Sequence, residues 1–224
     1  MASAKRSRGQ AQLDFPSAWG GCRAGAGPKP KGERAGVSHR RRAALASRFP
    51  VHVTLKLEPG LPSLRRGRAH SVLIAAFAAM RGRDGFRLVH YSVQSNHVHL
   101  LCEACGRVEL SRGIQALAIR IAKRLNKLWQ RAGRLFADRY HDRILRSPRE
   151  VRNALAYVLN NAVHHGVETI AGRVDPYSSG RWFSGWREPI REREIPPSPL
   201  ARARTWLLSV GWLRHGRIEL RDSG

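Results

Sequence analysis

Apolar positions that alternate with polar ones predict four β-strands along the chain. A run rich in β-branched residues over 49–57 predicts the first strand and ends at a Pro-Gly turn. Alternation resumes over residues 86–103, a stretch long enough for two strands that turn near residues 94–96. Residues 135–145 form the last predicted strand.

Three segments have the apolar spacing of amphipathic helices. They cover residues 68–80, 110–131 and 148–165, where apolar residues recur every three or four positions. The third begins at Ser147-Pro-Arg-Glu150, which combines an N-cap, a proline at the first helical position and a capping-box glutamate. The order strand, helix, two strands, helix, strand, helix predicts an α+β fold, an antiparallel sheet with helices packed on one face.

Composition divides the chain into three parts. Residues 1–45 lie in a basic, glycine-containing stretch without sustained apolar periodicity, which predicts a flexible arm. Residues 46–166 hold the predicted strands and helices and form the predicted domain. Residues 167–224 are a partly irregular C-terminal extension, whose aromatic residues could stack on bases or cap the core. These aromatic residues are Trp182, Phe183 and Trp186.

The net charge is far larger than solubility requires. The 224 residues contain 41 Lys and Arg against 16 Asp and Glu, a formal charge of +25, which indicates a polyanionic partner. For any single basic residue we favour a solvated face, but that interpretation does not account for a total of +25. The candidates for contacts with a nucleic-acid backbone are Arg40, Arg41, Arg42, Arg120, Lys123, Arg124, Lys127 and Arg131.

Neither a membrane nor an oxidising compartment is indicated. The longest apolar run, residues 72–80, is about half as long as a bilayer crossing requires. No apolar segment of a signal peptide follows the N-terminal charges. Three cysteines cannot build a disulfide framework. We therefore expect a soluble protein of a reducing compartment that does not contact a membrane.

His97 and His99 lie two residues apart in a predicted strand. Because strand side chains alternate between faces, both imidazoles project from the same face of the sheet. Two neutral imidazoles side by side form half of a metal site. The same spacing also fits two ordinary, partly exposed strand histidines, so a metal site needs a third group.

Cys102 and Cys105 follow this pair, and the four residues together resemble the ligand set of a structural zinc site. Cys102 is three residues beyond His99, so a continuing strand directs it to the opposite face. We therefore favour Cys102 as a small core residue. A strand that ended early would leave zinc ligation open.

The third predicted helix carries polar residues beside its apolar stripe. Asn153, Tyr157, Asn161 and His164 are spaced three or four residues apart and therefore share one face. Tyr157 is a candidate for chemistry, but it also fits a boundary residue with a buried ring and a solvated hydroxyl. The spacing alone leaves both interpretations open.

Four segments in this order resemble the HUH single-tyrosine transposases, and most of all the REP-associated tyrosine transposases. The resemblance covers about residues 46–166. It departs from the family pattern at Ala162, where the family has proline, and at Gln94-Ser95, where it has Met-Pro. The four segments are His97-Val-His99, the basic helix that follows, Gly133 to Arg143, and Tyr157-Val-Leu-Asn-Asn161-Ala-Val163.

The resemblance implies a ferredoxin-like sheet, Tyr157 as nucleophile, and His97, His99 and Asn161 as ligands of Mg²⁺ or Mn²⁺. Nitrogen ligands favour Mn²⁺. It further implies a bacterial, cytoplasmic, nucleoid-associated enzyme, monomeric or homodimeric. Such an enzyme cleaves and rejoins single-stranded DNA, beside a hairpin, through a 5′-phosphotyrosine. A phenol with a pKa of about 10 is protonated at neutral pH, and the metal ion or His164 is the candidate base.

Two other functions fit parts of the pattern. A catalytically inactive regulator would bind hairpins through the same sheet and basic residues, and it would bind equally well with Tyr157 changed to Phe. A small zinc-bearing RNA-binding protein would instead use Cys102 and Cys105.

Overall fold

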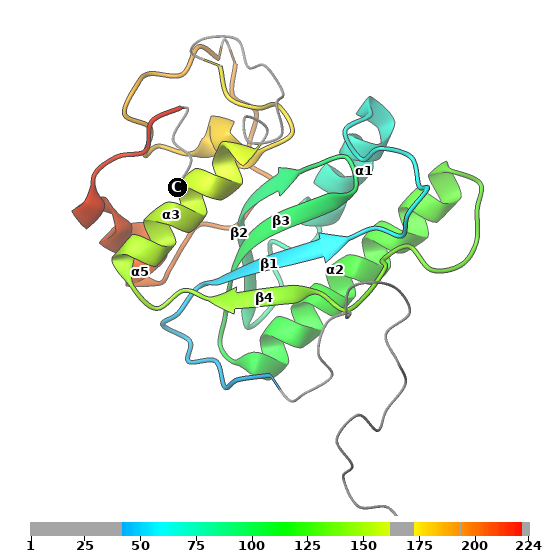
Figure 1. Cartoon of the computed structure of the whole chain (residues 1–224), viewed down its shortest axis with the longest axis horizontal. Helices are drawn as coiled ribbons and strands as arrows, with labels where there is room; N and C mark the ends of the chain where they lie inside the picture. The colour runs from blue at the N-terminus through cyan, green and yellow to red at the C-terminus, as the bar shows by residue number, and fades with distance from the viewer. Residues whose placement is uncertain (1–41, 162–172, 193, 221–224) are drawn as a thin grey trace, which may run out of the picture. The chain divides into compact units, whose positions relative to one another are not determined.

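The computed structural model describes residues 42–161, 173–192 and 194–220 (Figure 1). The elements follow the predicted order and give the predicted α+β fold. The strands are β1 (Val51–Lys56), β2 (Phe86–Val93), β3 (His97–Ala104) and β4 (His141–Ile144). The longer helices are α1 (Gly67–Ala78), α2 (Arg107–Leu128) and α3 (Pro148–Leu159). Three short helices follow, η1 (Ser179–Trp182), α5 (Trp206–Ser209) and η2 (Gly211–His215).

The four strands form one antiparallel sheet in the order β2-β3-β1-β4. β1 lies between β3 and β4, so it is a central strand, and β4 is an edge strand. The register places Thr54 of β1 opposite His99 of β3 and His52 of β1 opposite Arg143 of β4. These pairs bring three separate stretches of sequence onto one patch of the sheet.

Two hydrophobic cores lie on the two faces of the sheet. Val51, Val53 and Leu55 of β1 face the core that α1 and α2 cover. Leu101 of β3 belongs to the second core, which α3 covers together with the C-terminal extension. The prediction that helices pack on one face therefore holds for α1 and α2, whereas α3 lies on the opposite face. His52 and His99 point to the face of α3, because they alternate with the first-core residues.

The start of α3 shows why a helix begins at Pro148. The Ser147 hydroxyl accepts a hydrogen bond from the Glu150 backbone N–H at 3.2 Å, and the Glu150 carboxylate accepts from the Ser147 N–H at 3.1 Å. This is the capping box that the sequence predicted. The Arg146 N–H also donates to Glu150, and these contacts lower the pKa of the Glu150 carboxyl.

Some segment boundaries differ from the sequence prediction. β4 begins at His141 and not near residue 135, because residues 135–137 contact the end of β1 only through single links such as the Leu57–Phe136 bridge. The predicted end of the third helix near residue 165 lies outside the described residues, as do Arg40, Arg41 and His164.

Cys102 and two aromatic residues of the extension are core residues. Cys102 is fully buried in the first core, where burial raises the pKa of its thiol. It thus faces away from His99, as the alternation predicted. Phe183 and Trp186 are buried in the second core, and Phe183 also packs against Trp212. Of the two interpretations left open for these aromatic residues, capping the core is therefore correct for both.

A buried carboxylate attaches the C-terminal extension to the sheet. Glu103 of β3 is fully buried and forms an ion pair with Arg87 at 2.9 Å. The same carboxylate accepts hydrogen bonds from the backbone N–H groups of Arg204 and Thr205 and from the Thr205 hydroxyl, all within 3.0 Å. Each carboxylate oxygen therefore has charged or backbone partners.

We expect Glu103→Ala to lower the free energy of unfolding by about 3 kcal/mol, because a guanidinium and two backbone donors lose their acceptor. Glu219→Ala is the matched control, since Glu219 pairs with Arg187 at the surface with its side chain 51% exposed. Surface pairs contribute about 0–1 kcal/mol. Denaturant titration of both variants gives the comparison, and equal losses would contradict an anchoring role for Glu103.

Candidate active site

His97 and His99 face each other at the start of β3. Their Nε2 atoms are 3.0 Å apart and their rings are nearly perpendicular. The Asn96 side-chain oxygen lies 2.8 Å from His97 Nδ1. An amide oxygen only accepts, so His97 Nδ1 carries the hydrogen and His97 Nε2 presents its lone pair. The pair predicted from the sequence thus directs ring nitrogens at one shared point.

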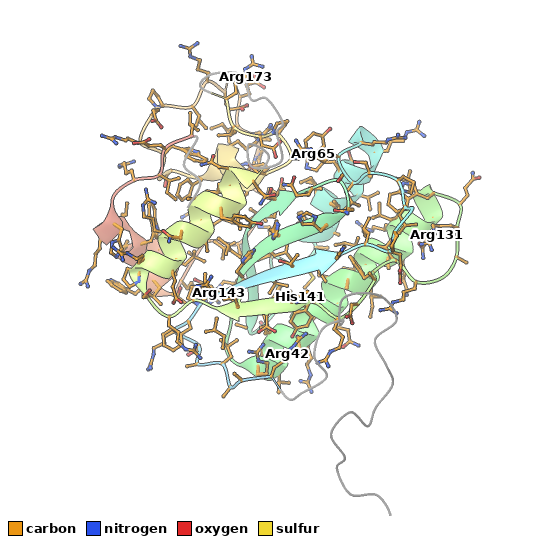
Figure 2. All side chains as sticks on the ribbon, viewed as in Figure 1. Arg42, Arg65, Arg131, His141, Arg143 and Arg173 are labelled. Carbon is orange, nitrogen blue, oxygen red and sulfur yellow. The ribbon has the colours of Figure 1, made fainter. Side chains whose placement is uncertain are left out.

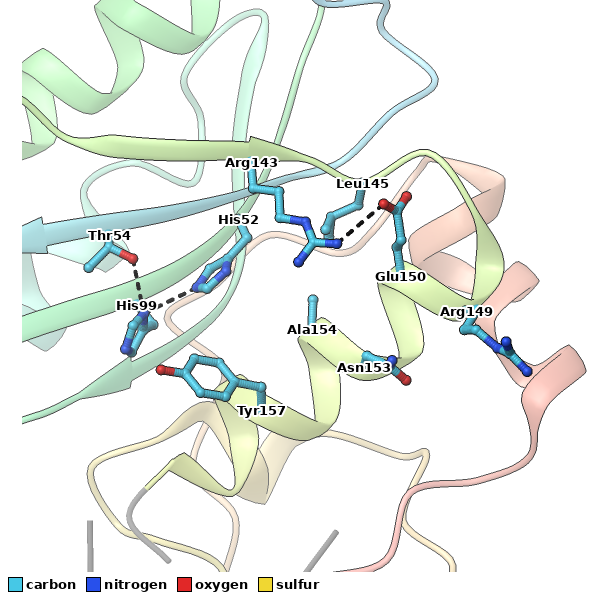
Figure 3. A pocket seen from close by; sticks show the side chains of 10 residues that line it. All are labelled: His52, Thr54, His99, Arg143, Leu145, Arg149, Glu150, Asn153, Ala154 and Tyr157. Atoms are coloured by element: carbon cyan, nitrogen blue, oxygen red, sulfur yellow. Dashed lines mark hydrogen bonds and ion pairs between the residues drawn. The ribbon is translucent and has the colours of Figure 1, made fainter. Parts of the chain in front are cut away.

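The other nitrogen of His99 is held by two residues of β1. His99 Nδ1 lies 3.1 Å from the Thr54 hydroxyl and 3.1 Å from His52 Nε2 (Figure 3). Burial, with a smaller contribution from the positive charge of Arg143, lowers the pKa of His52 to about 4. His52 is therefore neutral at physiological pH, and its Nε2 can accept the hydrogen on His99 Nδ1. That tautomer leaves the lone pair of His99 on Nε2, the atom that faces His97.

Tyr157 projects from α3 onto these imidazoles. Its ring centroid lies 5.2 Å from that of His99 and 5.9 Å from that of His52, edge to face in both cases. Figure 3 shows the hydroxyl pointing toward His99. The phenol and the histidines therefore occupy one face of the sheet, although His99 and His52 lie about sixty and about a hundred residues before Tyr157 in the sequence.

Asn161 lies four residues beyond Tyr157, just after α3 ends. Its side chain is fully buried, and neither Oδ1 nor Nδ2 has a hydrogen-bond partner among the described residues. Among the described residues, this amide therefore lacks the hydrogen bonds that usually accompany the burial of a polar side chain.

A cavity of about 660 Å³ opens between the sheet and the first turns of α3 (Figure 3). Its size falls within the range of small-molecule pockets, about 300–1,000 Å³. The lining is polar and basic on the side of β4 and α3. The residues are His52, Thr54, His99, Arg143, Leu145, Arg149, Glu150, Asn153, Ala154 and Tyr157.

The basic residues predicted from α2 lie elsewhere. Arg120, Lys123, Arg124 and Lys127 are exposed on α2, which covers the face of the sheet opposite Tyr157. Arg131, three residues beyond that helix, instead donates to Asn126 and to the Arg134 carbonyl.

Arg42 is also used within the fold (Figure 2). It pairs with Asp142 at 3.2 Å, and its guanidinium lies 3.5 Å from the centre of the Tyr140 ring. The guanidinium groups of Arg131 and Arg42 therefore both have partners within the fold. Neither residue lines the cavity that contains Tyr157.

Sequence reasoning missed four residues of this site, namely His52, Thr54, Arg143 and Arg149. A signal existed for the first two, because the alternation in Val51-His-Val-Thr54 already separates two polar side chains from two core valines. The pairing of β1 with β3 and β4, which brings them to His99 and Arg143, is a long-range feature that no local pattern encodes.

The histidine pair fits a divalent metal ion. The two Nε2 atoms lie 3.0 Å apart, close enough for both imidazoles to bind the same cation. The hydrogen bonds to Nδ1 of each ring are those that usually orient metal-binding histidines. Among the described residues no three His, Cys, Asp or Glu side chains are arranged to hold a metal ion.

Comparison with known families supplies the classification. The sequence profile of a transposase family described as IS200-like matches residues 63–161. The chain carries an IS200-like transposase domain. The matched residues of this transposase domain include His97, His99, Tyr157 and Asn161, whereas His52 and Thr54 precede them. The resemblance to tyrosine transposases seen in the sequence is thereby confirmed.

Solved structures show the same fold. The IS200-like domain resembles a REP-associated tyrosine transposase bound to a REP hairpin, with a TM-score of 0.52 and 16% sequence identity. The likeness covers 63% of this chain and 82% of that chain. A search of curated protein sequences finds no match. Within the described residues, no helix combines the length and apolar character needed to cross a membrane.

Proposed function

We propose that this transposase is a metal-dependent enzyme that cleaves and rejoins single-stranded DNA through a 5′-phosphotyrosine at Tyr157, beside a hairpin. One observation carries the proposal. The Tyr157 ring lies edge-on to His99, and His99 Nε2 lies 3.0 Å from His97 Nε2. Tyr157 and His99 line the same cavity, and His97 lies next to His99, which supports a nucleophile beside half of a cation site.

The chemistry assigned to Tyr157 is a transesterification. Its hydroxyl oxygen attacks the phosphorus of a DNA phosphodiester and forms a new P–O bond, while the bond from phosphorus to the 3′-oxygen breaks. The phenol loses its proton, and the departing 3′-oxygen gains one. Because the ester is conserved, a 3′-hydroxyl of another strand reverses the step and joins the strands without an external energy source.

His97 and His99 would hold Mn²⁺ or Mg²⁺ through Nε2, with Asn161 as the proposed polar third ligand. A bound divalent cation neutralises charge on the phosphoryl oxygens. His52 and Thr54 act through His99, because they fix the hydrogen on Nδ1 and thus orient Nε2. The metal ion and His164 remain the two proposed candidates for activating the phenol.

The substrate assignment rests on charge and access. A formal charge of +25 favours a polyanion, and a single strand can bend into a cavity beside a sheet, which a duplex cannot do. The similar structure is described as bound to a REP hairpin. These points support a hairpin with a single-stranded flank as the substrate.

The direct test is covalent capture. Full-length protein is incubated with Mn²⁺ and a pool of DNA hairpins whose single-stranded flanks have randomised sequence, labelled at either the 5′ or the 3′ end. We expect the 3′ label to migrate with the protein on a denaturing gel and the 5′-labelled fragment to end in a free 3′-hydroxyl. Hydrolysed fragments without an adduct, or no cleavage of any pool member, would contradict the proposal.

A further inference from the structure

A second cavity adjoins the one that holds Tyr157. Its volume is about 320 Å³, and it shares Arg143 and Glu150 with the first cavity. Because two residues line both, the cavities are neighbours across the edge strand β4. The remaining residues of the second cavity are Arg42, Ala43, Arg107, Asp142, Ile144 and Arg146.

Arg143 stands between the two cavities with an accessible guanidinium. Its position in β4 is directly opposite His52 of β1, so both side chains project from the same face. Its ion pair with Glu150 is long, at 3.4 Å, and its side chain is 70% exposed. A pair of this kind is weak and screened by salt.

Within the described residues, some of the arginines around Arg143 are paired with carboxylates and others are not. Arg42 and Arg107 are both paired with Asp142. The guanidinium groups of Arg146 and Arg149 are exposed, and no ion pair or hydrogen bond of theirs is found among the described residues. Glu150 is the ion-pair partner of Arg143, and its oxygens already accept from the backbone of residues 146 and 147. The shared wall of the two cavities thus carries an excess of positive charge.

A row of side chains on α3 extends from Arg149, in the positively charged region, to the phenol of Tyr157. Arg149, Asn153 and Tyr157 are spaced four residues apart, and all three line the larger cavity. At 1.5 Å rise per residue the row is about 12 Å long, which corresponds to about three nucleotides of a stacked strand. The cavity therefore has room for more than the phosphate under attack.

We propose that these two cavities form a phosphate-binding groove for the single strand that flanks the scissile phosphate, with Arg143, Arg146 and Arg149 on the strand's phosphates. The strand would leave Tyr157 along the first two turns of α3 and cross the edge of the sheet at Arg143. This inference deepens the proposed function and rests on it for the position of the scissile phosphate. Guanidinium groups suit the task because their paired donors match phosphate oxygens.

The test measures binding and not cleavage, in full-length protein carrying Tyr157→Phe. The groove variant adds Arg143→Ala and Arg149→Ala, and the matched control adds Arg191→Ala and Arg202→Ala, two exposed arginines of the C-terminal extension. Both change the net charge equally. The probes are a fluorescent oligothymidine strand and a blunt DNA hairpin, titrated by fluorescence anisotropy over a series of salt concentrations.

We expect the groove variant to bind oligothymidine at least about tenfold more weakly, and to reduce the slope of log K against log salt by about 1.4, since each phosphate contact on a single strand contributes about 0.7. The control should change neither the slope nor the affinity comparably. For the blunt hairpin, the groove variant should lose no more affinity than the control variant loses, each relative to the Tyr157→Phe protein.

Three results would overturn the groove. They are an unchanged salt slope, an equal loss in the control, and an equal loss on the blunt hairpin. Failure of the groove is distinguishable from failure of the proposed function, because adduct formation is scored separately in the unmodified protein. If binding depends on the groove arginines but the unmodified protein forms no adduct, the proposed cleavage chemistry is contradicted and the proposed groove is supported.

Discussion

Tyr157→Phe is expected to reduce the covalent protein–DNA adduct by roughly 10⁴-fold or more, to below detection on a denaturing gel. The substitution removes only the hydroxyl oxygen. The ring that packs against His99 and His52 is retained, so the fold and the affinity for hairpin DNA should remain within about twofold of the unmodified protein.

Tyr140→Phe is the control for this change. Tyr140 is also a half-buried tyrosine, and its hydroxyl lies 3.0 Å from that of Ser111, but it lies under Arg42 and away from the histidines. We expect this variant to form the adduct at the unmodified rate. A variant lacking the Tyr157 hydroxyl that still formed an adduct would assign the nucleophile to another residue. Hairpin binding by a protein that never forms an adduct would favour the inactive regulator.

Loss of the histidine pair is expected to abolish metal binding in the absence of DNA. We predict that His97→Ala raises the Kd for Mn²⁺ by more than about 100-fold, and that His52→Phe raises it by roughly tenfold, because outer partners orient the ligand without touching the ion. The readout is electron paramagnetic resonance of free Mn²⁺ during a titration, which does not depend on activity.

Two further variants make this metal prediction specific. His215→Ala removes an exposed histidine of η2 and should leave the affinity for Mn²⁺ unchanged. Thr54→Val removes the second partner of His99 Nδ1 with little change in volume, and it should act in the same direction as His52→Phe. Unchanged Mn²⁺ affinity in His97→Ala would contradict the metal site. Unchanged affinity in both β1 variants would contradict the orienting role.

Local patterns predicted most of the elements and the central pair of the site. Alternation placed His97 and His99 on one face and Cys102 on the other, and helical spacing placed Tyr157 beside the apolar stripe of α3. These inferences succeeded because each depends only on the period of a strand or a helix. The metal, nucleophile and base roles assigned to these residues remain predictions.

Features set by long-range packing were not predictable in the same way. Nothing near His52 in the sequence indicates that β1 will pair with β3 and bring it to His99. Composition likewise could not separate Arg42, which pairs with Asp142, from an arginine available to DNA. From the sequence, the aromatic residues of the extension fitted a base-stacking surface as well as a core cap. The structure decides for Phe183 and Trp186, because both are buried in the second core.

Because β1 is a central strand of the sheet, it limits where the domain can be truncated or fused to another protein. The residues that match the family begin after β1, yet removing that strand would separate β3 from β4 and leave unpaired backbone groups through the middle of the sheet. Stopping at residue 161 would uncover the apolar side of α3 that Trp212 and Leu208 now shield from water. Any fragment meant for crystallisation or fusion should therefore carry both flanks with it.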